Sequence, residues 1–181
     1  MAKLAFMTIA VLIAEVDDPR IQGFLDRVEN NNKNAENSEG FIGRAITDPE
    51  TGESNWGKRT MPKVYQRDEY LNKRVMTLSL WDDLESVFAF SYYGSHGESL
   101  QHRYEWFVKS DLPIYVAYWV ADGERPTWEQ ACERLDRLAA EGPTPEAFNF
   151  KNAFDGRGNP IRVDRKRAKV KAAQYDMMYS S

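Results

Sequence analysis

The order of strand-like and helix-like segments constrains the fold of this chain more than any other feature. The apolar run LAFMTIAVLIA (residues 4–14) is too short to cross a membrane as a helix and is predicted to be a buried strand. Asp18 and Pro19 then form an N-cap and first-turn pair that starts an amphipathic helix. The segments FIGRAIT (41–47) and RVMTLSLW (74–81) are predicted to be the second and third strands.

The second half of the chain repeats this alternation. A helix pair is expected between residues 82 and 107, and PIYVAYWV (113–120) is predicted to be a strand buried on both faces. Thr127 and Gln130 form a capping box at the start of another amphipathic helix, which Gly142 ends. The resulting order is the split βαβ, or ferredoxin-like, pattern with an appended helix. We therefore predict an α+β fold with an antiparallel sheet.

The pattern also predicts how the domain is completed. We expect residues 1–154 to form one domain whose helices cover one face of the sheet only. Packing two such sheets face to face in a homodimer would bury the other face. Residues 155–181 are basic in their middle part and are predicted to be a solvated C-terminal tail. The alternative is that the apolar residues at its end bind a partner subunit or fill a pocket.

Composition excludes several classes of protein. The net charge of -4 gives no reason to expect nucleic-acid binding, and we expect no membrane association. Cys132 is the single cysteine, so an internal disulfide and a cysteine-rich metal site are both impossible, which suits a reducing cytoplasm. The sequence lacks the common nucleotide, hydrolase and zinc-protease motifs, and no metal site is expected.

Residues 48–72 form the longest irregular segment of the sequence. Irregular segments of this length inside compact domains are usually functional or disordered. Trp56, Tyr65 and Tyr70 argue against disorder, because large rings gain most from burial. A lid over a pocket and an oligomer contact are both consistent with this composition.

The segment FSYYGSHGESLQHRYEWF (90–107) holds both histidines and is the candidate site. If its second part is one regular helix, an imidazole and a guanidinium share one face with apolar side chains, at His96, Leu100, Arg103 and Phe107. A mostly apolar pocket with a few placed polar groups is typical of small-molecule sites.

The two histidines have different predicted roles. His96 would lie in the first helical turn, where the positive end of the helix dipole lowers its pKa and favours a neutral imidazole. A neutral imidazole can bind iron or accept a proton, although His96 could instead help to cap the helix. His102 lies roughly 120° around the helix from His96, so the two cannot share a metal ion. We expect His102 to be partly exposed, and a haem ligand there is the less favoured choice.

Polar and aromatic neighbours complete the candidate site. Arg103 could hold a carboxylate, a haem propionate or a phenolate, or could instead form an ion pair within its helix. Tyr92 could donate a hydrogen bond to a developing oxyanion, or could simply pack. The predicted substrate-binding residues are the aromatic and aliphatic ones of this segment, namely Phe90, Tyr93, Leu100, Trp106 and Phe107.

Three longer runs carry a resemblance to known proteins: SLWDDLESVFAFSYYGSHGESLQHRYEWF, YWVADGERPTWEQACERL and EGPTPEAFNF. They resemble an uncharacterised bacterial family over roughly residues 3–154, most specifically in GERPTWEQA and GPTPEAF. The resemblance implies membership of the dimeric α+β barrel superfamily, which includes the antibiotic biosynthesis monooxygenases.

The chain also resembles, more weakly, spheroidene monooxygenase, a haem enzyme of the same superfamily. The similar order of side chains is Trp81, Phe90, Tyr92, His96, Arg103, Trp106 and Phe107. Haem-degrading monooxygenases and aldoxime dehydratases of this superfamily place a haem-binding histidine on the corresponding helix. The resemblance therefore implies a haem held non-covalently by His96.

These observations predict a small-molecule oxidoreductase of the monooxygenase type, acting on a hydrophobic substrate in an apolar pocket. It would use haem on His96, or no cofactor, in which case His96 is the general base and Arg103 or Tyr92 stabilises the oxyanion. The alternatives are a cofactor-independent cyclase, isomerase or dehydratase on the same scaffold, and a ligand-binding protein without catalysis.

Overall fold

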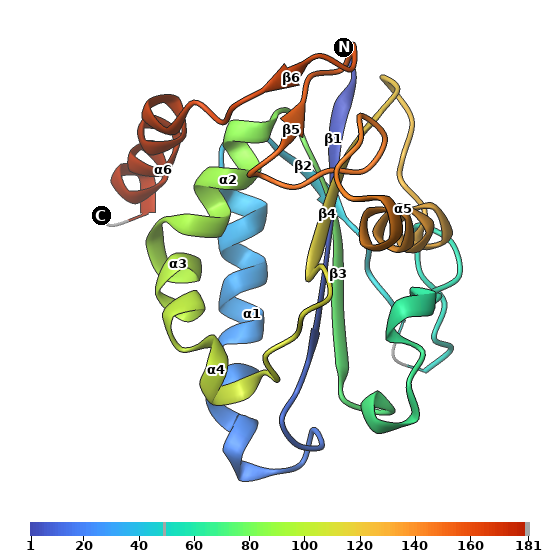
Figure 1. Cartoon of the computed structure of the whole chain (residues 1–181). Coiled ribbons are helices and arrows are strands. Elements are labelled where there is room, and N and C mark those ends of the chain that lie inside the picture. Colours follow the sequence, from blue (N-terminus) through green and yellow to red (C-terminus); the bar gives the residue numbers. More distant parts are fainter. Residues whose placement is uncertain (49, 180–181) are drawn as a thin grey trace.

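The computed structural model describes residues 1–48 and 50–179, without the side chains of Ser95, His96, Glu98, Ser99 and residues 174–179. Strands and helices alternate in the order that the sequence predicts (Figure 1). The strands are β1 (Lys3–Val11), β2 (Phe41–Arg44), β3 (Arg74–Trp81), β4 (Tyr115–Val120), β5 (Ala153–Phe154) and β6 (Pro160–Ile161). The α-helices are α1 (Gln22–Asn37), α2 (Leu84–Tyr92), α3 (Gly94–Gln101), α4 (Arg103–Trp106), α5 (Trp128–Glu141) and α6 (Arg165–Tyr179). Short 3₁₀ helices are η1 (Pro19–Ile21), η2 (Lys63–Tyr65) and η3 (Asp68–Tyr70).

The main sheet has four strands in the order β2-β3-β1-β4, and each neighbouring pair is antiparallel. This is the ferredoxin-like arrangement, so the predicted α+β fold class is confirmed. The apolar run of residues 4–14 forms the central strand β1, as predicted. Within the described part of the chain, no helix is long and apolar enough to span a membrane.

One face of the sheet is covered by α1 and α2, and α3 and α4 lie beside α1 (Figure 1). On this side Leu4 and Trp81 are fully buried and pack with Leu84 and Val87 of α2. The local signals read from the sequence explain where these helices begin. Asp83 caps α2, since its carboxylate accepts a hydrogen bond from the Ser86 amide at 2.8 Å.

The second face of the sheet is covered by the same chain, contrary to the expectation that helices lie on one side only. Helix α5 lies across this face (Figure 1) and buries Leu135 and Cys132 against Met7 and Leu78. The capping box of α5 is present as predicted, between Thr127 and Gln130. A partner sheet is therefore not needed to bury this face. The homodimer stays a prediction, but burial of the second sheet face no longer supports it.

The irregular segment 48–72 completes the second face. Trp56 and Tyr65 are buried in the same cluster as α5, and the Trp128 indole donates to Ser54 Oγ at 3.1 Å. The Asp136 carboxylate of α5 accepts hydrogen bonds from the backbone amides at the start of η2, 2.9 and 3.1 Å long. This segment is thus part of the core, which differs from the two roles considered for it, a lid and an oligomer contact.

The C-terminal region also differs from the predicted solvated tail over its described part. Strands β5 and β6 pair as a hairpin, and α6 packs beside α2 (Figure 1). Ala168 is fully buried against Phe88 and Ala89. Apolar docking of α6 explains why residues that are basic in sequence form an ordered helix here.

Ion pairs fix the orientation of α6 on the domain. Lys171 is buried and its Nζ lies 2.7 Å from Glu39 and 3.6 Å from Asp83. Arg167 lies 2.5 Å from Asp83 and 3.7 Å from Glu85, whose other oxygen accepts the Asp164 amide. Two cations of α6 therefore pair with three carboxylates of the domain. The apolar residues expected to bind a partner or a pocket lie beyond Ala173, outside the described side chains.

The role of α5 predicts the effect of a core substitution. Leu135→Ala should lower the free energy of unfolding by about 3 kcal/mol, because it leaves a cavity under the second sheet face. Chemical denaturation followed by tryptophan fluorescence measures this. Arg137→Ala, on the exposed side of the same helix, is the control and should change stability by less than about 0.5 kcal/mol. Equal effects of the two substitutions would contradict the burial of this face by α5.

The ion pairs predict how α6 is held. Lys171→Met should increase amide hydrogen exchange in α6 about fivefold, because the ion pair that it removes joins a buried ammonium group to a half-exposed carboxylate and is worth about 1 kcal/mol. Lys169→Met is the matched control, since Lys169 is exposed on the same helix and should leave the exchange rates unchanged. Unchanged protection in the Lys171 variant would show that the ion pairs do not hold the helix.

Candidate functional site

The helix that carries the predicted site is divided. The sequence predicts one regular helix through Arg103 to Phe107, but α3 ends at Gln101 and α4 begins at Arg103. His102, with φ −90° and ψ 2°, lies between them and interrupts the helical repeat. The expected alignment of Leu100, Arg103 and Phe107 on one face is therefore wrong.

The structure describes the side chain of His102 but not that of His96. The His96 side chain lies outside the described residues, so its roles as haem ligand and general base stay predictions. His102 is half exposed, and its Nδ1 lies 2.7 Å from Glu105 Oε1. Its ring also packs against Trp106, with centroids 6.1 Å apart. His102 is a surface residue with a local carboxylate partner, as expected for a partly exposed histidine.

Arg103 is held by its own helical segment. Its Nη1 donates to the Leu100 carbonyl at 2.7 Å and its Nη2 to the Tyr104 hydroxyl at 3.2 Å. The guanidinium also lies 4.3 Å from the centre of the Tyr104 ring, which is exposed. The predicted role of Arg103 in holding a substrate anion is not supported by this geometry.

Most of the predicted substrate-binding residues serve as packing residues. Phe107 packs edge-on against Phe24 of α1 at 5.0 Å, and Trp106 is buried under the Arg27 guanidinium. Phe90 stacks on Trp81 at 5.4 Å, and Tyr93 packs near α6. Leu100 is partly buried on α3. Their role as substrate-binding residues stays a prediction.

Tyr92, one of the predicted catalytic residues, packs in a group of aromatic side chains. Its ring is 46% exposed and lies 4.6 Å from Phe88 and 5.8 Å from Phe150. Phe150 in turn contacts Tyr115 at 5.0 Å, and both contact Phe6 at 5.4 Å. We call these five residues the aromatic cluster. It joins the end of α2, strands β1 and β4, and the segment after α5.

The Tyr115 hydroxyl is the best-positioned donor in the aromatic cluster. Its oxygen accepts a hydrogen bond from the Phe150 amide at 3.2 Å. Burial and the neighbouring Tyr92 hydroxyl both raise the pKa of Tyr115 above its ordinary value of 10.0, although the amide bond opposes this. The phenol therefore stays protonated at neutral pH. Because the amide occupies one lone pair, the phenol proton points away from the amide, and the Tyr92 hydroxyl is its hydrogen-bond partner.

The sheet beneath the helices carries hydroxyl groups next to this tyrosine. Thr8 of β1 pairs with Thr77 of β3 on one side and with Tyr115 of β4 on the other. Residues that are paired in this way place their side chains on the same face of a sheet. The two threonine oxygens are 2.7 Å apart. A row of three hydroxyl side chains thus crosses the middle of the sheet.

The helix layer leaves part of this row accessible. Thr77 is exposed although it lies in an internal strand and on the helix-covered face. Val28 belongs to the apolar stripe of α1 together with buried Ile21 and Ala35, yet it is 37% exposed. Thr77 and Val28 are thus each exposed on the helix-covered side of the molecule.

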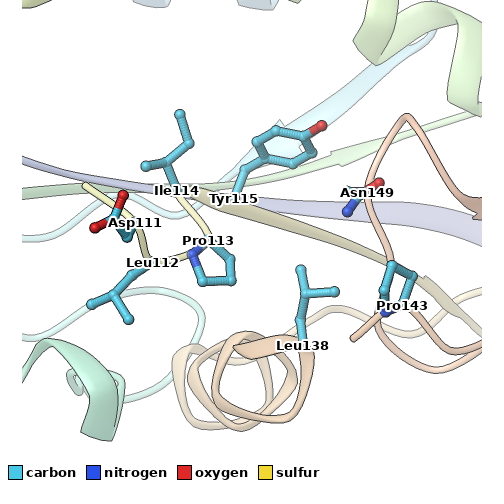
Figure 2. A pocket seen from close by; sticks show the side chains of 8 residues that line it. All are labelled: Asp111, Leu112, Pro113, Ile114, Tyr115, Leu138, Pro143 and Asn149. Carbon is cyan, nitrogen blue, oxygen red and sulfur yellow. The ribbon is translucent and has the colours of Figure 1, made fainter. Parts of the chain in front are cut away.

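A cavity lies on the other side of Tyr115, at the free edge of β4. Its volume is about 350 Å³, and Figure 2 shows the side chains around it. The Tyr115 ring points away from Leu138 of α5, toward the helix-covered face (Figure 2). The lining residues come from the segment before β4, from α5 and from the segment after it: Asp111, Leu112, Pro113, Ile114, Tyr115, Leu138, Pro143 and Asn149.

Sequence reasoning missed Tyr115 and Phe150, because both appeared as apolar residues in a strand and a loop. A signal was present in the strands themselves. Thr8 interrupts the apolar run of residues 4–14, and Thr77 lies between Met76 and Leu78 in the third strand, where a hydroxyl is unfavourable in a sealed core. Pairing these two positions would have located the accessible row and, next to it, Tyr115.

The comparison with protein families agrees with the first resemblance. The chain matches the family described as Domain of unknown function (DUF3291) over residues 3–163, and it belongs to that family. Membership of an uncharacterised family is thereby confirmed, with a match that extends through β6. No curated protein is detectably similar to this chain in sequence.

Two tyrosines of β4 provide a matched test of the site. Tyr118 faces α5, is buried, and its hydroxyl has no hydrogen-bond partner among the described residues. Tyr118→Phe should therefore raise the free energy of unfolding by about 1 kcal/mol, since it removes an unsatisfied polar group. Tyr115→Phe should lower it by about 1 kcal/mol, because the Phe150 amide loses its acceptor. Denaturant titrations of both variants measure the difference, and effects of the same sign would refute this assignment.

Proposed function

We propose that this protein is a small-molecule oxidoreductase of the monooxygenase type, with a hydrophobic substrate that carries a carbonyl or phenolic oxygen. The observation that carries the proposal is the protonated Tyr115 hydroxyl. It is held by the Phe150 amide within the aromatic cluster, beside an accessible row of threonines. The implied membership of the dimeric α+β barrel superfamily supports the same class of function.

The surroundings of Tyr115 favour an aromatic, uncharged ligand. Phe6, Phe88 and Phe150 offer ring faces and edges, on which flat aromatic molecules pack well. Thr8, Thr77 and Tyr92 add hydroxyl groups but no charge. A mostly apolar surface with a few oriented hydroxyls selects a ligand by its shape and by one or two oxygen atoms.

The proposed reaction needs little from the protein besides orientation and charge stabilisation. A substrate with an acidic methylene next to aromatic rings loses a proton to become an electron-rich anion, which reacts with oxygen. The methylene carbon loses both hydrogens and gains one oxygen atom as a carbonyl, and the second oxygen atom leaves as water. Tyr115 would donate a hydrogen bond to the substrate oxygen on which the negative charge develops. His96 stays the expected base for the first step.

A haem-dependent version receives no support from the described residues. His102 is half exposed and bound to Glu105. Arg103, the expected partner of a haem propionate, is hydrogen-bonded to the Leu100 carbonyl of α3. The proposal therefore uses the substrate itself as the source of electrons.

A direct assay tests the proposal. Anthrone, a tricyclic aromatic ketone with an acidic methylene, should be converted to anthraquinone with consumption of one oxygen molecule per turnover. Tyr115→Phe should lower the rate about one hundredfold, because it removes one oxyanion donor. Tyr118→Phe, on the opposite face of the same strand, should retain the rate. Oxygen uptake and product absorbance measure both.

Other outcomes would overturn the proposal in distinguishable ways. Anthrone binding, seen as ligand-induced shifts in the NMR spectrum, without oxygen uptake would indicate a ligand-binding protein. Oxygen-independent exchange of the methylene protons with solvent deuterium would indicate an isomerase or cyclase that uses the same donor. A Soret band on addition of haemin, lost in His96→Ala, would restore the haem enzyme.

A further inference from the structure

The segment that follows α5 forms a tight turn anchored at its start to the sheet. Phe148 exchanges two backbone hydrogen bonds with Ala117 of β4, 2.8 and 2.9 Å long. The Asn149 Oδ1 then accepts the backbone amides of Lys151 and Asn152, both at 3.0 Å. A side-chain oxygen that binds amides two and three residues later replaces a backbone acceptor and closes the turn.

Phe150 lies inside this turn and depends on it for its orientation. Its amide is the one that donates to the Tyr115 hydroxyl. A second anchor follows, where the Trp119 indole donates to the Phe154 carbonyl at 2.7 Å. Between the two anchors, the Asn149 side chain supplies the hydrogen bonds that fix the path of the backbone through Phe150.

The direction of the Tyr115 proton follows from this arrangement. A phenol oxygen that accepts an amide on one side donates its own hydrogen away from that amide. The Phe150 amide therefore determines which side of the ring presents the proton. A shift of this amide would leave the hydroxyl free to rotate and would weaken its action as a fixed donor.

We infer that Asn149 is a positioning residue. Its side chain closes the turn that holds the Phe150 amide on Tyr115, so that the phenol donates toward the Tyr92 hydroxyl, on the side where the proposed substrate would bind. This role rests on the proposed function only in its last part, since the turn and the amide bond exist without a substrate. The motif EGPTPEAFNF ends with Asn149 and Phe150, so the positioning of Tyr115 is a proposed role for the end of this motif.

Three variants separate this role from general stabilisation. Asn149→Ala removes the accepting oxygen. Asn149→Asp replaces the amide oxygen with a carboxylate oxygen on a side chain of the same length, so an acceptor is retained. Asn152→Ala is the matched control, because it removes an exposed asparagine side chain from the same turn and leaves the accepting oxygen of Asn149 in place. Circular dichroism verifies that each variant is folded.

Amide hydrogen exchange of Phe150, measured by NMR, is the primary measurement. Asn149→Ala should accelerate exchange about tenfold, the equivalent of a net hydrogen bond, whereas Asn149→Asp and Asn152→Ala should leave it within about twofold. Tyr115→Phe should accelerate exchange at Phe150 but not at Lys151, which shows independently that the phenol is the acceptor. This variant keeps the test available if Asn149→Ala does not fold.

Unchanged protection of Phe150 in Asn149→Ala, or in Tyr115→Phe, would overturn the inference. Equal acceleration by Asn152→Ala would also overturn it, since the effect would then not depend on the Asn149 oxygen. Anthrone turnover is a separate measurement. If all variants and the parent protein fail to oxidise anthrone while the exchange pattern holds, the proposed function fails and the positioning of Tyr115 by Asn149 stands.

Discussion

Burial of both faces of the central strand is the constraint on which the rest of the structure depends. Strand β1 is apolar along most of its length, so it needs cover on both sides. Helices α1 and α2 provide one layer, and α5 with residues 48–72 provides the other. A single chain therefore builds a three-layer domain. The segment 48–72, although irregular, contributes buried rings where a second sheet was expected.

The candidate site lies where the helix layer leaves part of the sheet face exposed. The helix layer seals the two ends of the sheet but leaves Thr77 exposed near the middle. The threonine pair shares one hydrogen bond, and the Tyr115 hydroxyl next to it accepts a hydrogen bond from the Phe150 amide. An accessible polar row inside an otherwise apolar layer is more informative about function than any single side chain.

The sequence predicted local structure well, because caps and periodicity act over a few residues. The capping box at Thr127 and the limits of β3 were predicted closely. The site was predicted less well for two physical reasons. The helix is interrupted at His102, and Phe107 is already in an extended conformation, so the expected helical spacing does not hold through this segment. The partners of Tyr115 come from strands and loops distant in sequence, and periodicity within one segment carries no information about them.

Helix α6 has a consequence for the electrostatics of the family. The match to the family ends at residue 163, just before this helix, yet Glu39, Asp83 and Glu85 converge on its Arg167 and Lys171. In a relative that ended there, three neighbouring carboxylates would repel one another and would lose their counterions. Such a relative would need neutral residues at these positions, so acidic side chains there would mark, in sequence, the members that carry the helix.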